Sequence, residues 1–264
     1  MTVTVLGSGT STGVPEWRCE CAVCRDARTP ESRNHRTRAS IHLEKDGNHL
    51  QIDCGPDFLS QIDDCRIPRL DAVLFTHNHN DHIAGVNDLV LPCRKQDMDL
   101  PVYASEETLA LLRRNFDYLF TKATYQGGGV AHLLPHEVGE RFELLSFEVT
   151  PLPVVHGMVD CLGFRFDDFG YVPDVKVMPR TSLELLRGVT NLIIDGLSFN
   201  PQHPTHQSIG QAIDLIQILR PQQAWLTHLS HRVDHNRFPE QCEEHGLQLP
   251  PNVALAWDGQ VIAA

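Results

Sequence analysis

The chain has 264 residues, enough for one large domain or two small ones with a sizeable core. Apolar residues make up 41% of it and charged residues 21%, the composition of an ordinary soluble globular protein. Its formal charge of −12 opposes general binding to nucleic acid, and an anionic substrate would need cations at its site. No run of eighteen apolar residues and no secretory signal are visible, so we expect a cytoplasmic protein with no membrane partner.

The first predicted strand, Thr2–Leu6, leads into a glycine-rich loop at Gly7–Gly13. The loop lacks the Gly-Lys-Ser/Thr of a Walker loop, which favours a tight turn beside a metal site. Three thiols follow within six residues, at Cys19, Cys21 and Cys24, whereas the other cysteines stand singly. This spacing predicts a zinc site in a reducing compartment, with a fourth ligand from elsewhere; the alternative is three free thiols in a surface loop.

A basic stretch comes next, and it is either an anion site or a solvated connector: Arg25, Arg28, Arg33, His35, Arg36 and Arg38. Two strands, Ala39–Leu43 and His49–Ile52, are then predicted to form a hairpin, because the Asp-Gly between them is a turn signal. The second strand ends at Asp53, whose carboxylate would ligate a metal or orient a ligand imidazole. A short helix is expected over Phe58–Asp63.

Three histidines and an aspartate follow the apolar run Asp71–Phe75, which predicts a short buried strand. Because side chains alternate along an extended segment, His77 and His79 project to the same side. Asp81 and His82 lie past the turn and can reach a second ion. Imidazole and carboxylate ligands suit zinc, manganese or iron, and the lack of thiolate argues against a closed structural site. The alternative, a solvated histidine-rich loop, is disfavoured because further candidate ligands follow other strands.

The second half of the chain alternates strands with helices. A helix capped by Ser105 is predicted to run to Phe116, and Tyr118–Gly129 is expected to be a mobile loop over or near the site. One strand is expected over Phe142–Leu152, leading to His156. The other predicted strands are Val102–Ala104, Cys161–Phe166, Asn191–Asp195 and Ala224–Thr227, and the other predicted helices are Thr181–Leu186 and Ser208–Leu219.

Candidate ligands therefore recur at strand ends. Taken singly, His156 or His228 would more often be a satisfied core histidine than a ligand. Ligands collect at one edge of the strands in open α/β sheets, so the whole set predicts a pair of metal ions, with Asp174 as the bridge. The set comprises His77, His79, Asp81, His82, His156, Asp174 and His228.

The sequence Thr76-His77-Asn78-His79-Asn80-Asp81-His82 resembles the signature of the metallo-β-lactamase-fold hydrolases. For one branch the resemblance covers nearly the whole chain, because that branch opens with a loop like Gly7–Pro15 and carries a Cys-x-Cys-x-x-Cys cluster. This branch is similar to the phosphodiesterase of the carbon–phosphorus lyase pathway, which hydrolyses cyclic phosphates of ribose. The resemblance implies an α/β (α+β) fold, a four-layer αββα sandwich, in a single domain over residues 1–264.

The resemblance also implies the site residues. Asp81 and His206 are the expected catalytic residues, with His206 contacting substrate and protonating the leaving group. The segment around the bridging aspartate departs from the pattern of the relatives, and Asp168 is the competing candidate. The implied metal ligands are His77, His79 and His156 for one ion, Asp81, His82 and His228 for the other, Asp174 as the bridge, and Cys19, Cys21, Cys24 and His231 for a structural zinc.

We therefore expect a phosphodiesterase acting on small anionic phosphodiesters with two divalent ions, Mn²⁺ or Zn²⁺. The rival hypotheses are hydrolysis of another bond, such as a thioester or lactone, and a non-enzymatic metal-binding module of a biosynthetic operon. A β-lactamase is disfavoured without a signal peptide, and a tRNA-processing nuclease is disfavoured by the charge of −12 and the lack of a basic exosite arm. No stable nucleic-acid partner is expected. The sequence is compatible with either a monomer or a homodimer.

Overall fold

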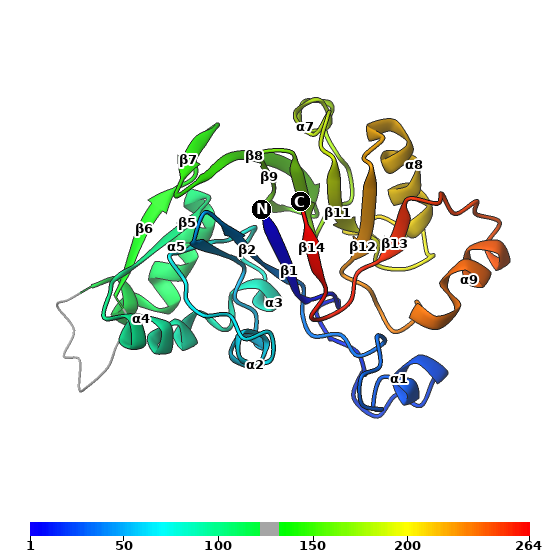
Figure 1. The fold of residues 1–264 in the computed structure, drawn as a ribbon, viewed down its shortest axis with the longest axis horizontal. Coiled ribbons are helices and arrows are strands. Elements are labelled where there is room, and N and C mark those ends of the chain that lie inside the picture. The colour runs from blue at the N-terminus through cyan, green and yellow to red at the C-terminus, as the bar shows by residue number, and fades with distance from the viewer. Residues whose placement is uncertain (122–131) are drawn as a thin grey trace.

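The computed structural model describes residues 1–121 and 132–264. Within these residues, two mixed sheets of seven strands each face one another (Figure 1). The first sheet has the order β14 (Val261–Ala263), β1 (Thr2–Gly7), β2 (Ser40–Lys45), β3 (Asn48–Ile52), β4 (Ala72–Leu74), β5 (Leu100–Ala104) and β6 (Leu133–Glu137). The second has the order β13 (Val253–Leu255), β12 (Gln223–Thr227), β11 (Asn191–Asp195), β10 (Phe169–Val172), β9 (Val159–Phe166), β8 (Phe147–His156) and β7 (Phe142–Leu144).

Helices cover the outer face of each sheet, which makes the four-layer αββα sandwich that the sequence predicted (Figure 1). The first sheet carries α2 (Phe58–Asp64), α4 (Val90–Gln96), α5 (Glu106–Asn115) and α6 (Asp117–Phe120), and the second carries α7 (Arg180–Leu185), α8 (Ile209–Leu219) and α9 (Phe238–Glu244). The short elements are α1 (Ala22–Asp26), α3 (Asn80–Ile83), η1 (Val86–Leu89) and η2 (His235–Arg237). Among the described helices, none is long and apolar enough to cross a membrane.

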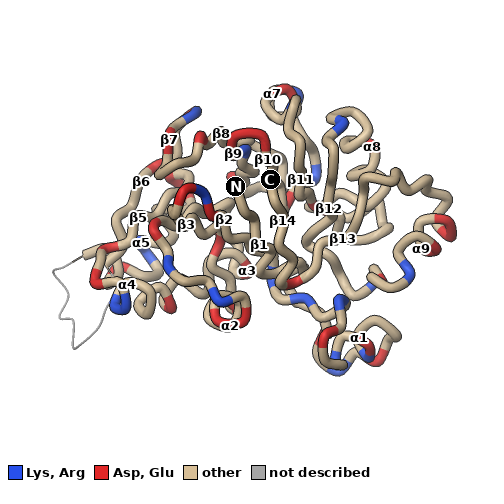
Figure 2. Tube along the Cα trace, viewed as in Figure 1, with Lys and Arg blue, Asp and Glu red and all other residues tan. Residues whose placement is uncertain are grey.

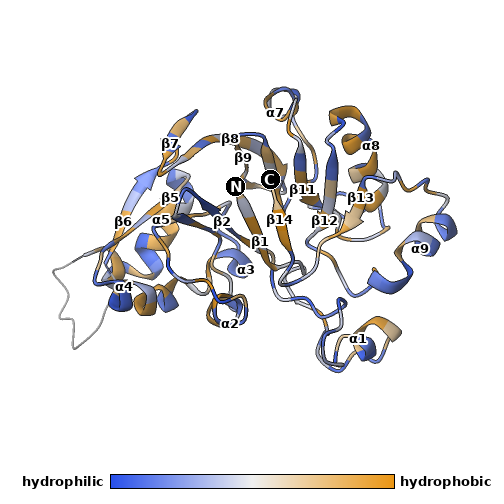
Figure 3. Cartoon of the chain, viewed as in Figure 1, coloured by the Kyte–Doolittle hydropathy of each residue, from blue (hydrophilic) through white to orange (hydrophobic). Residues whose placement is uncertain are grey.

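The core between the sheets is built from alternating strand residues. The second sheet contributes a cluster of fully buried aromatic rings, with Phe164, Phe166 and Tyr171 all at 0% exposure. They pack against aliphatic side chains of the first sheet, such as Val3 and Ile41. Figure 3 shows apolar residues along β1, β14 and α8, the elements that border this core or cover the second sheet.

Local signals begin and end the elements as expected. Asp46 and Gly47 have φ of 53° and 77°, the left-handed pair that a tight turn between β2 and β3 requires. Ser105 accepts a hydrogen bond from the Thr108 amide and caps α5. A capping box between Ser208 and Gln211 starts α8 directly after the His203–Gln207 loop.

Two expectations need correction. The strand predicted over Phe142–Leu152 is two strands, because Leu145 has a φ of 57° and the chain reverses there between β7 and β8. The loop predicted at Tyr118–Gly129 begins inside α6, and its residues from 122 onward lie outside the described residues. Alternation of apolar residues continues on both sides of a turn, so the pattern alone did not reveal the reversal.

The carboxyl ends of parallel strands converge where the two sheets meet. In the first sheet, β3 and β4 run parallel, with Ile52 paired to Leu74. In the second sheet, β10, β11 and β12 run parallel, and Asp195 at the end of β11 pairs with Thr227. The residues that follow these ends therefore arrive at one edge, as ligands do in other α/β sheets. The first and last strands, β1 and β14, also lie side by side (Figure 1).

Shortening a side chain between the sheets should weaken the whole sandwich. We expect Phe164→Ala to lower the free energy of unfolding by about 3–5 kcal/mol, because it removes a fully buried ring and leaves a cavity. Val261→Ala, at a position 65% exposed on β14, is the control and should change it by less than about 0.5 kcal/mol. Urea unfolding measures both, and equal effects would contradict a tightly packed layer between the sheets.

Candidate metal centre

Three imidazoles meet at the first candidate ion position. His77 Nε2 lies 2.9 Å from His79 Nδ1, which lies 3.2 Å from His156 Nε2. Two ligands bound to one ion through bonds of about 2.0–2.1 Å lie roughly 2.9–3.4 Å apart. The three nitrogens therefore have the separations of a shared ion. His77 and His79 come from the segment after β4, and His156 ends β8 on the other sheet.

A second group meets beside the first. Asp81 Oδ2 lies 3.3 Å from His82 Nε2 and 3.4 Å from His228 Nε2. Asp174 lies between the groups, with Oδ2 3.1 Å from His82 Nε2, and with Oδ1 3.3 Å from His228 Nε2 and 3.6 Å from His156 Nε2. Asp168, the competing candidate, instead accepts hydrogen bonds from Thr190.

Two buried atoms in this second group are placed to bind a metal ion rather than to form a hydrogen bond with each other. His82 Nε2 and Asp174 Oδ2 have no hydrogen-bond partner among the described residues, although they lie 3.1 Å apart. Buried polar atoms are nearly always paired, so an unpaired nitrogen and oxygen aimed at common space indicate a place where a cation can bind. The donor set of imidazole and carboxylate suits Zn²⁺ or Mn²⁺.

Two of the candidate ligand rings, those of His82 and His156, are oriented through their second nitrogen. Asp53 Oδ2 lies 2.8 Å from His82 Nδ1, which is the orienting role that the sequence suggested for Asp53. Asp53 also accepts hydrogen bonds from the amide and hydroxyl of Thr76. His156 Nδ1 donates to the carbonyl of Thr205 at 2.8 Å. These contacts fix the rings, so binding an ion requires little rearrangement.

The turn that presents Asp81 depends on a close backbone approach. A Cβ on Gly55 would lie 2.1 Å from the carbonyl oxygen of Asp81, so only glycine fits there. The amide of Cys54 donates to the carbonyl of His82 at 2.8 Å. The loop after β3 thereby packs against α3 and fixes the positions of Asp81 and His82 relative to Asp53.

Burial and charge set the protonation of the ligands. Burial lowers the pKa of His77, His79 and His156, so their imidazoles are neutral and keep the lone pairs that ligate metals. Burial alone would raise the pKa of Asp174, but the nearby His228 and His82 outweigh it and hold this pKa well below its usual range. The aspartate is therefore ionised, as a ligand must be.

His206 lies at the edge of this group. Its Nδ1 is 2.8 Å from Asp195 Oδ2 and its Nε2 is 3.6 Å from Asp174 Oδ1. Burial would lower its pKa, but the Asp195 carboxylate outweighs burial and raises it to about 9. The sequence marked Asp195 only as an acid ending a buried strand. The sequence offered one signal for this role that was missed. Asp53 directly follows β3 and Asp195 ends β11, and each carboxylate contacts the Nδ1 atom of a histidine in the site.

The cysteine cluster forms a separate site. The Nδ1 atom of His231 lies 3.3 Å from Cys19 Sγ and 3.6 Å from the Sγ atoms of Cys21 and Cys24. In a tetrahedral zinc site a nitrogen and a sulfur are about 3.5 Å apart. Burial would raise the pKa of Cys21, but hydrogen bonds from the Cys24 amide and the neighbouring side chains lower it to about 7, which favours the thiolate. These four side chains fit one zinc ion.

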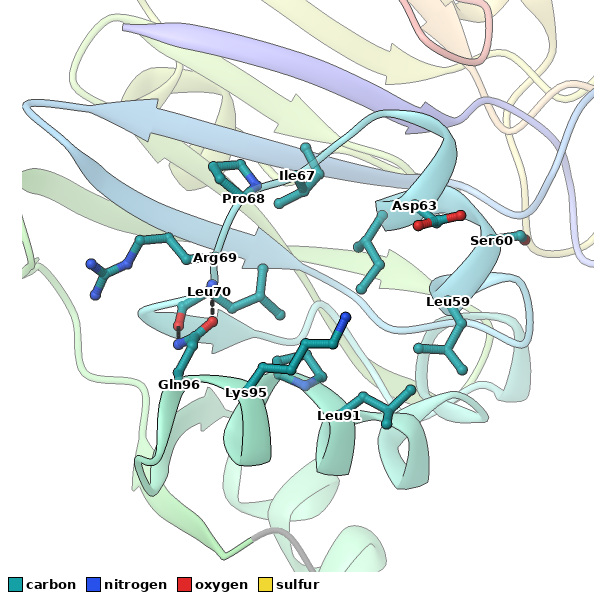
Figure 4. Close-up of a pocket in the computed structure, with 12 residues that line it drawn as sticks. Leu59, Ser60, Asp63, Ile67, Pro68, Arg69, Leu70, Leu91, Lys95 and Gln96 are labelled. Atoms are coloured by element: carbon teal, nitrogen blue, oxygen red, sulfur yellow. Dashed lines mark hydrogen bonds between the residues drawn. The ribbon is translucent and has the colours of Figure 1, made fainter.

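Other candidate cations lie elsewhere. Arg94 and Lys95 are both on α4, where Lys95 reaches into a separate cavity of about 550 Å³ between α2 and α4 (Figure 4). Figure 2 shows Lys and Arg along the chain between α1 and β2, the basic stretch of the sequence. That stretch is not simply solvated, because Arg36 within it is 1% exposed. Arg38 forms an ion pair with Asp57.

Comparison with known proteins gives the family. The model of the Beta-lactamase superfamily domain matches residues 48–229. A crystal structure of a new diphosphatase from the PhnP family is 34% identical, covers 100% of this chain and 97% of its own, and superposes with a TM-score of 0.87. The chain belongs to the β-lactamase superfamily and, within it, to the PhnP family.

Two further matches widen the picture of the superfamily. An octanoyltransferase of Porphyromonas gingivalis is 37% identical over 256 residues, which are 97% of this chain but 50% of that protein. This chain therefore spans half the length of that relative. Zn²⁺-bound PqqB from Methylobacterium extorquens, with 20% identity, a TM-score of 0.80 and full coverage of both chains, shares the fold.

The two candidate sites use different side chains, so they should be separable. We expect Asp81→Ala to lower the metal content of the purified protein while zinc at the cysteine cluster remains, and to reduce turnover by more than about 100-fold, since even residues behind a ligand matter 10- to 100-fold. Asp64→Ala, at an exposed position ending α2, is the matched control. Elemental analysis and diesterase assays measure the outcome. An Asp81→Ala protein with normal metal content and activity would refute the second ion position.

Proposed function

We propose that this protein is a metal-dependent phosphodiesterase that hydrolyses small phosphodiesters, such as cyclic ribose phosphates. We further propose that residues 1–264 act as one domain, which the pairing of β1 with β14 supports. The proposed ligands are His77, His79 and His156 for one divalent ion, Asp81, His82 and His228 for a second, Asp174 between them, and Cys19, Cys21, Cys24 and His231 for a zinc.

The observation that carries the proposal is the pair of His206 and Asp195 beside the candidate ligands. When bound, two divalent ions supply Lewis acidity, activation of water and neutralisation of the charge that builds up at phosphorus. The departing alkoxide of a diester also needs a proton. His206 is held by Asp195 with its Nε2 directed toward Asp174, and its raised pKa keeps it protonated at neutral pH. It is therefore positioned to act as a general acid.

The charges around the site favour a diester over a monoester. A monoester dianion presents a third anionic oxygen, which needs a cation beyond the two ions. Lys176 is the nearby candidate, but its Nζ donates to the carbonyls of Pro201 and His206. Arg38 is paired with Asp57. A diester, with one negative charge and two free oxygens, leaves no oxygen without a partner.

The comparisons support phosphorus chemistry and add a second candidate. The PhnP-family neighbour at 34% identity is a diphosphatase, so a substrate containing a diphosphate bond is the second candidate for this chain. Hydrolysis of a thioester or lactone remains a rival because the superfamily fold serves many reactions. A non-enzymatic role in a biosynthetic operon is disfavoured, since a module that only binds metal has no use for the pairing of His206 with Asp195.

The substrate class can be tested directly. With added Mn²⁺ or Zn²⁺, we expect clear turnover of bis(p-nitrophenyl) phosphate and of small cyclic phosphates, and far weaker turnover of p-nitrophenyl phosphate, because the third oxygen of the monoester has no partner. A dinucleoside diphosphate in the same panel tests the second candidate. Preference for the monoester would overturn the assignment, and turnover of a thioester or lactone alone would move the protein to the rival class.

The general acid can be tested through the leaving group. We expect His206→Ala to slow hydrolysis of diesters with alkyl leaving groups by about 10²- to 10⁴-fold. Hydrolysis that releases p-nitrophenolate should slow far less, because that anion departs without a proton. His245→Ala, which changes an exposed histidine stacked on Phe199, is the control. Equal losses on both kinds of substrate would show that His206 does not donate the proton.

A further inference from the structure

One short segment belongs to both candidate metal sites. His228 directs its Nε2 to Asp81 and Asp174, and three residues later His231 directs its Nδ1 to the cysteines. Only Leu229 and Ser230 separate the two ligands. A shift of this segment would therefore change the position of a ligand in each site at once.

The backbone of this segment is held in an uncommon conformation. His228 has a φ of 57°, in the left-handed region that residues with a side chain rarely occupy. Such a residue persists only where the surroundings hold it. Here the Leu229 amide donates to the Ser8 carbonyl at 2.9 Å, the Thr10 amide donates to the Leu229 carbonyl at 3.2 Å, and the Ser230 amide donates to the Leu197 carbonyl at 3.0 Å.

The remaining backbone group between the two ligands is held by a buried arginine. Arg36 donates through Nη1 to the Ser230 carbonyl at 3.0 Å and through Nη2 to Asn34 Oδ1 at 3.1 Å. Its side chain forms no ion pair with any carboxylate in residues 1–121 and 132–264, and its Nε has no partner there. Burial lowers the pKa of Arg36 to about 10, so the guanidinium still carries its charge at neutral pH. Burying a cation is costly, and a fully buried cation that donates only to neutral oxygens is rare. We therefore infer that Arg36 serves to position the groups it binds.

The same arginine also holds the loop that carries the thiols. Its backbone pairs with Val14 through two hydrogen bonds of 2.8 Å, and Val14 packs in the small cluster with Val23 and Cys24. Asn34, which accepts from Arg36, also accepts from the His235 amide and donates to Asp234. Arg36 therefore links the cysteine loop to the chain on both sides of His231.

We propose that the cysteine site and the catalytic metal centre are energetically coupled, with Arg36 as the positioning residue that transmits the coupling through Ser230. The proposal rests on the metal ligands given under the proposed function. An ion at the cysteines fixes the loop that carries Val14, and Val14 is paired with the Arg36 backbone. Arg36 in turn holds the Ser230 carbonyl, which restrains His228 in its left-handed conformation. The catalytic centre then binds its ion without having to order that ligand. Coupling between binding sites is reciprocal, so each ion raises the affinity for the other.

The test measures Mn²⁺ affinity rather than activity. Mn²⁺ prefers oxygen and imidazole ligands over thiolates, so free Mn²⁺ measured by electron paramagnetic resonance reports on the catalytic centre. The full chain is stripped with chelator, its fold is checked by circular dichroism, and one equivalent of Cd²⁺ is added to half of it. Absorbance from cadmium–thiolate bonds verifies that Cd²⁺ occupies the cysteines. We expect Cd²⁺ to tighten Mn²⁺ binding by at least about 5-fold, the lower end of coupling between two sites.

Arg36→Lys tests the role of the arginine, because lysine keeps the charge but cannot bind Ser230 and Asn34 together. In this variant we expect Cd²⁺ to bind the cysteines and to change Mn²⁺ affinity by less than about 2-fold, below the usual range of coupling. In the Cd²⁺-loaded state, Mn²⁺ should bind more weakly to this variant than to the wild type. Arg237→Met, which removes an exposed arginine paired with Glu244, is the matched control and should keep the coupling.

The outcomes separate the hypotheses. Mn²⁺ affinity that is unaffected by Cd²⁺ in the wild type overturns the coupling and leaves the proposed function intact. Coupling that survives in Arg36→Lys overturns the role of Arg36. Absence of any Mn²⁺ binding in the Cd²⁺-loaded wild type overturns the catalytic metal centre itself, and the coupling with it. A variant that is merely less stable would lower the unfolding temperature and keep the ratio of the two Mn²⁺ affinities.

Discussion

A buried carboxylate in need of positive partners organises the centre of this structure. Asp174 is 1% exposed, and ring nitrogens of His82, His228 and His156 lie 3.1–3.6 Å from its oxygens. A carboxylate taken out of water costs several kcal/mol unless charges and hydrogen bonds compensate for it. Four chain segments from both sheets meet at this point, and the candidate metal centre depends on their doing so.

Backbone strain is concentrated at the same place. Asp53 and His228 both have positive φ, and each lies directly after a strand that points at the site. Each such residue costs about 1–3 kcal/mol, which the surrounding hydrogen bonds offset. The carboxylate of Asp53 accepts from Thr76 and faces His82, whereas the chain after His228 is fixed by Ser8, Leu197 and Arg36. Rigid ligands with fixed ring orientations lower the reorganisation needed to bind an ion.

The fold does not select the reaction. PqqB shares it at 20% identity, as does the short form of human tRNase Z at 18%. Within such a fold, the groups around the candidate metal ligands distinguish one reaction from another. In this chain those groups are the pairing of His206 with Asp195 and the shortage, among the described residues, of nearby cations without a hydrogen-bond partner. The acidic surface of the protein adds to that shortage, since its formal charge is −12.

The sequence by itself indicated alternating strands and helices and the meeting point of the candidate ligands, and the four layers were implied by the resemblance of its histidine-rich signature. Strands of four to eight apolar residues, each followed by His or Asp, locate the candidate ligands because the carboxyl ends of parallel strands share an edge. His77, His79, Asp81 and His82 lie within six residues, so their proximity is a local property of the chain.

Only the tertiary structure decided the burial of Arg36, the partner of His206, and the position of Asp174, rather than Asp168, beside the histidines. Arg36 and Ser230 are 194 positions apart, and no periodicity or turn signal records a contact across that distance. The turn at Leu145 was missed for the opposite reason, since an alternating pattern looks the same on both sides of a reversal. Local chemistry fixes which residues end a strand, whereas the path of the chain fixes which of those ends come together.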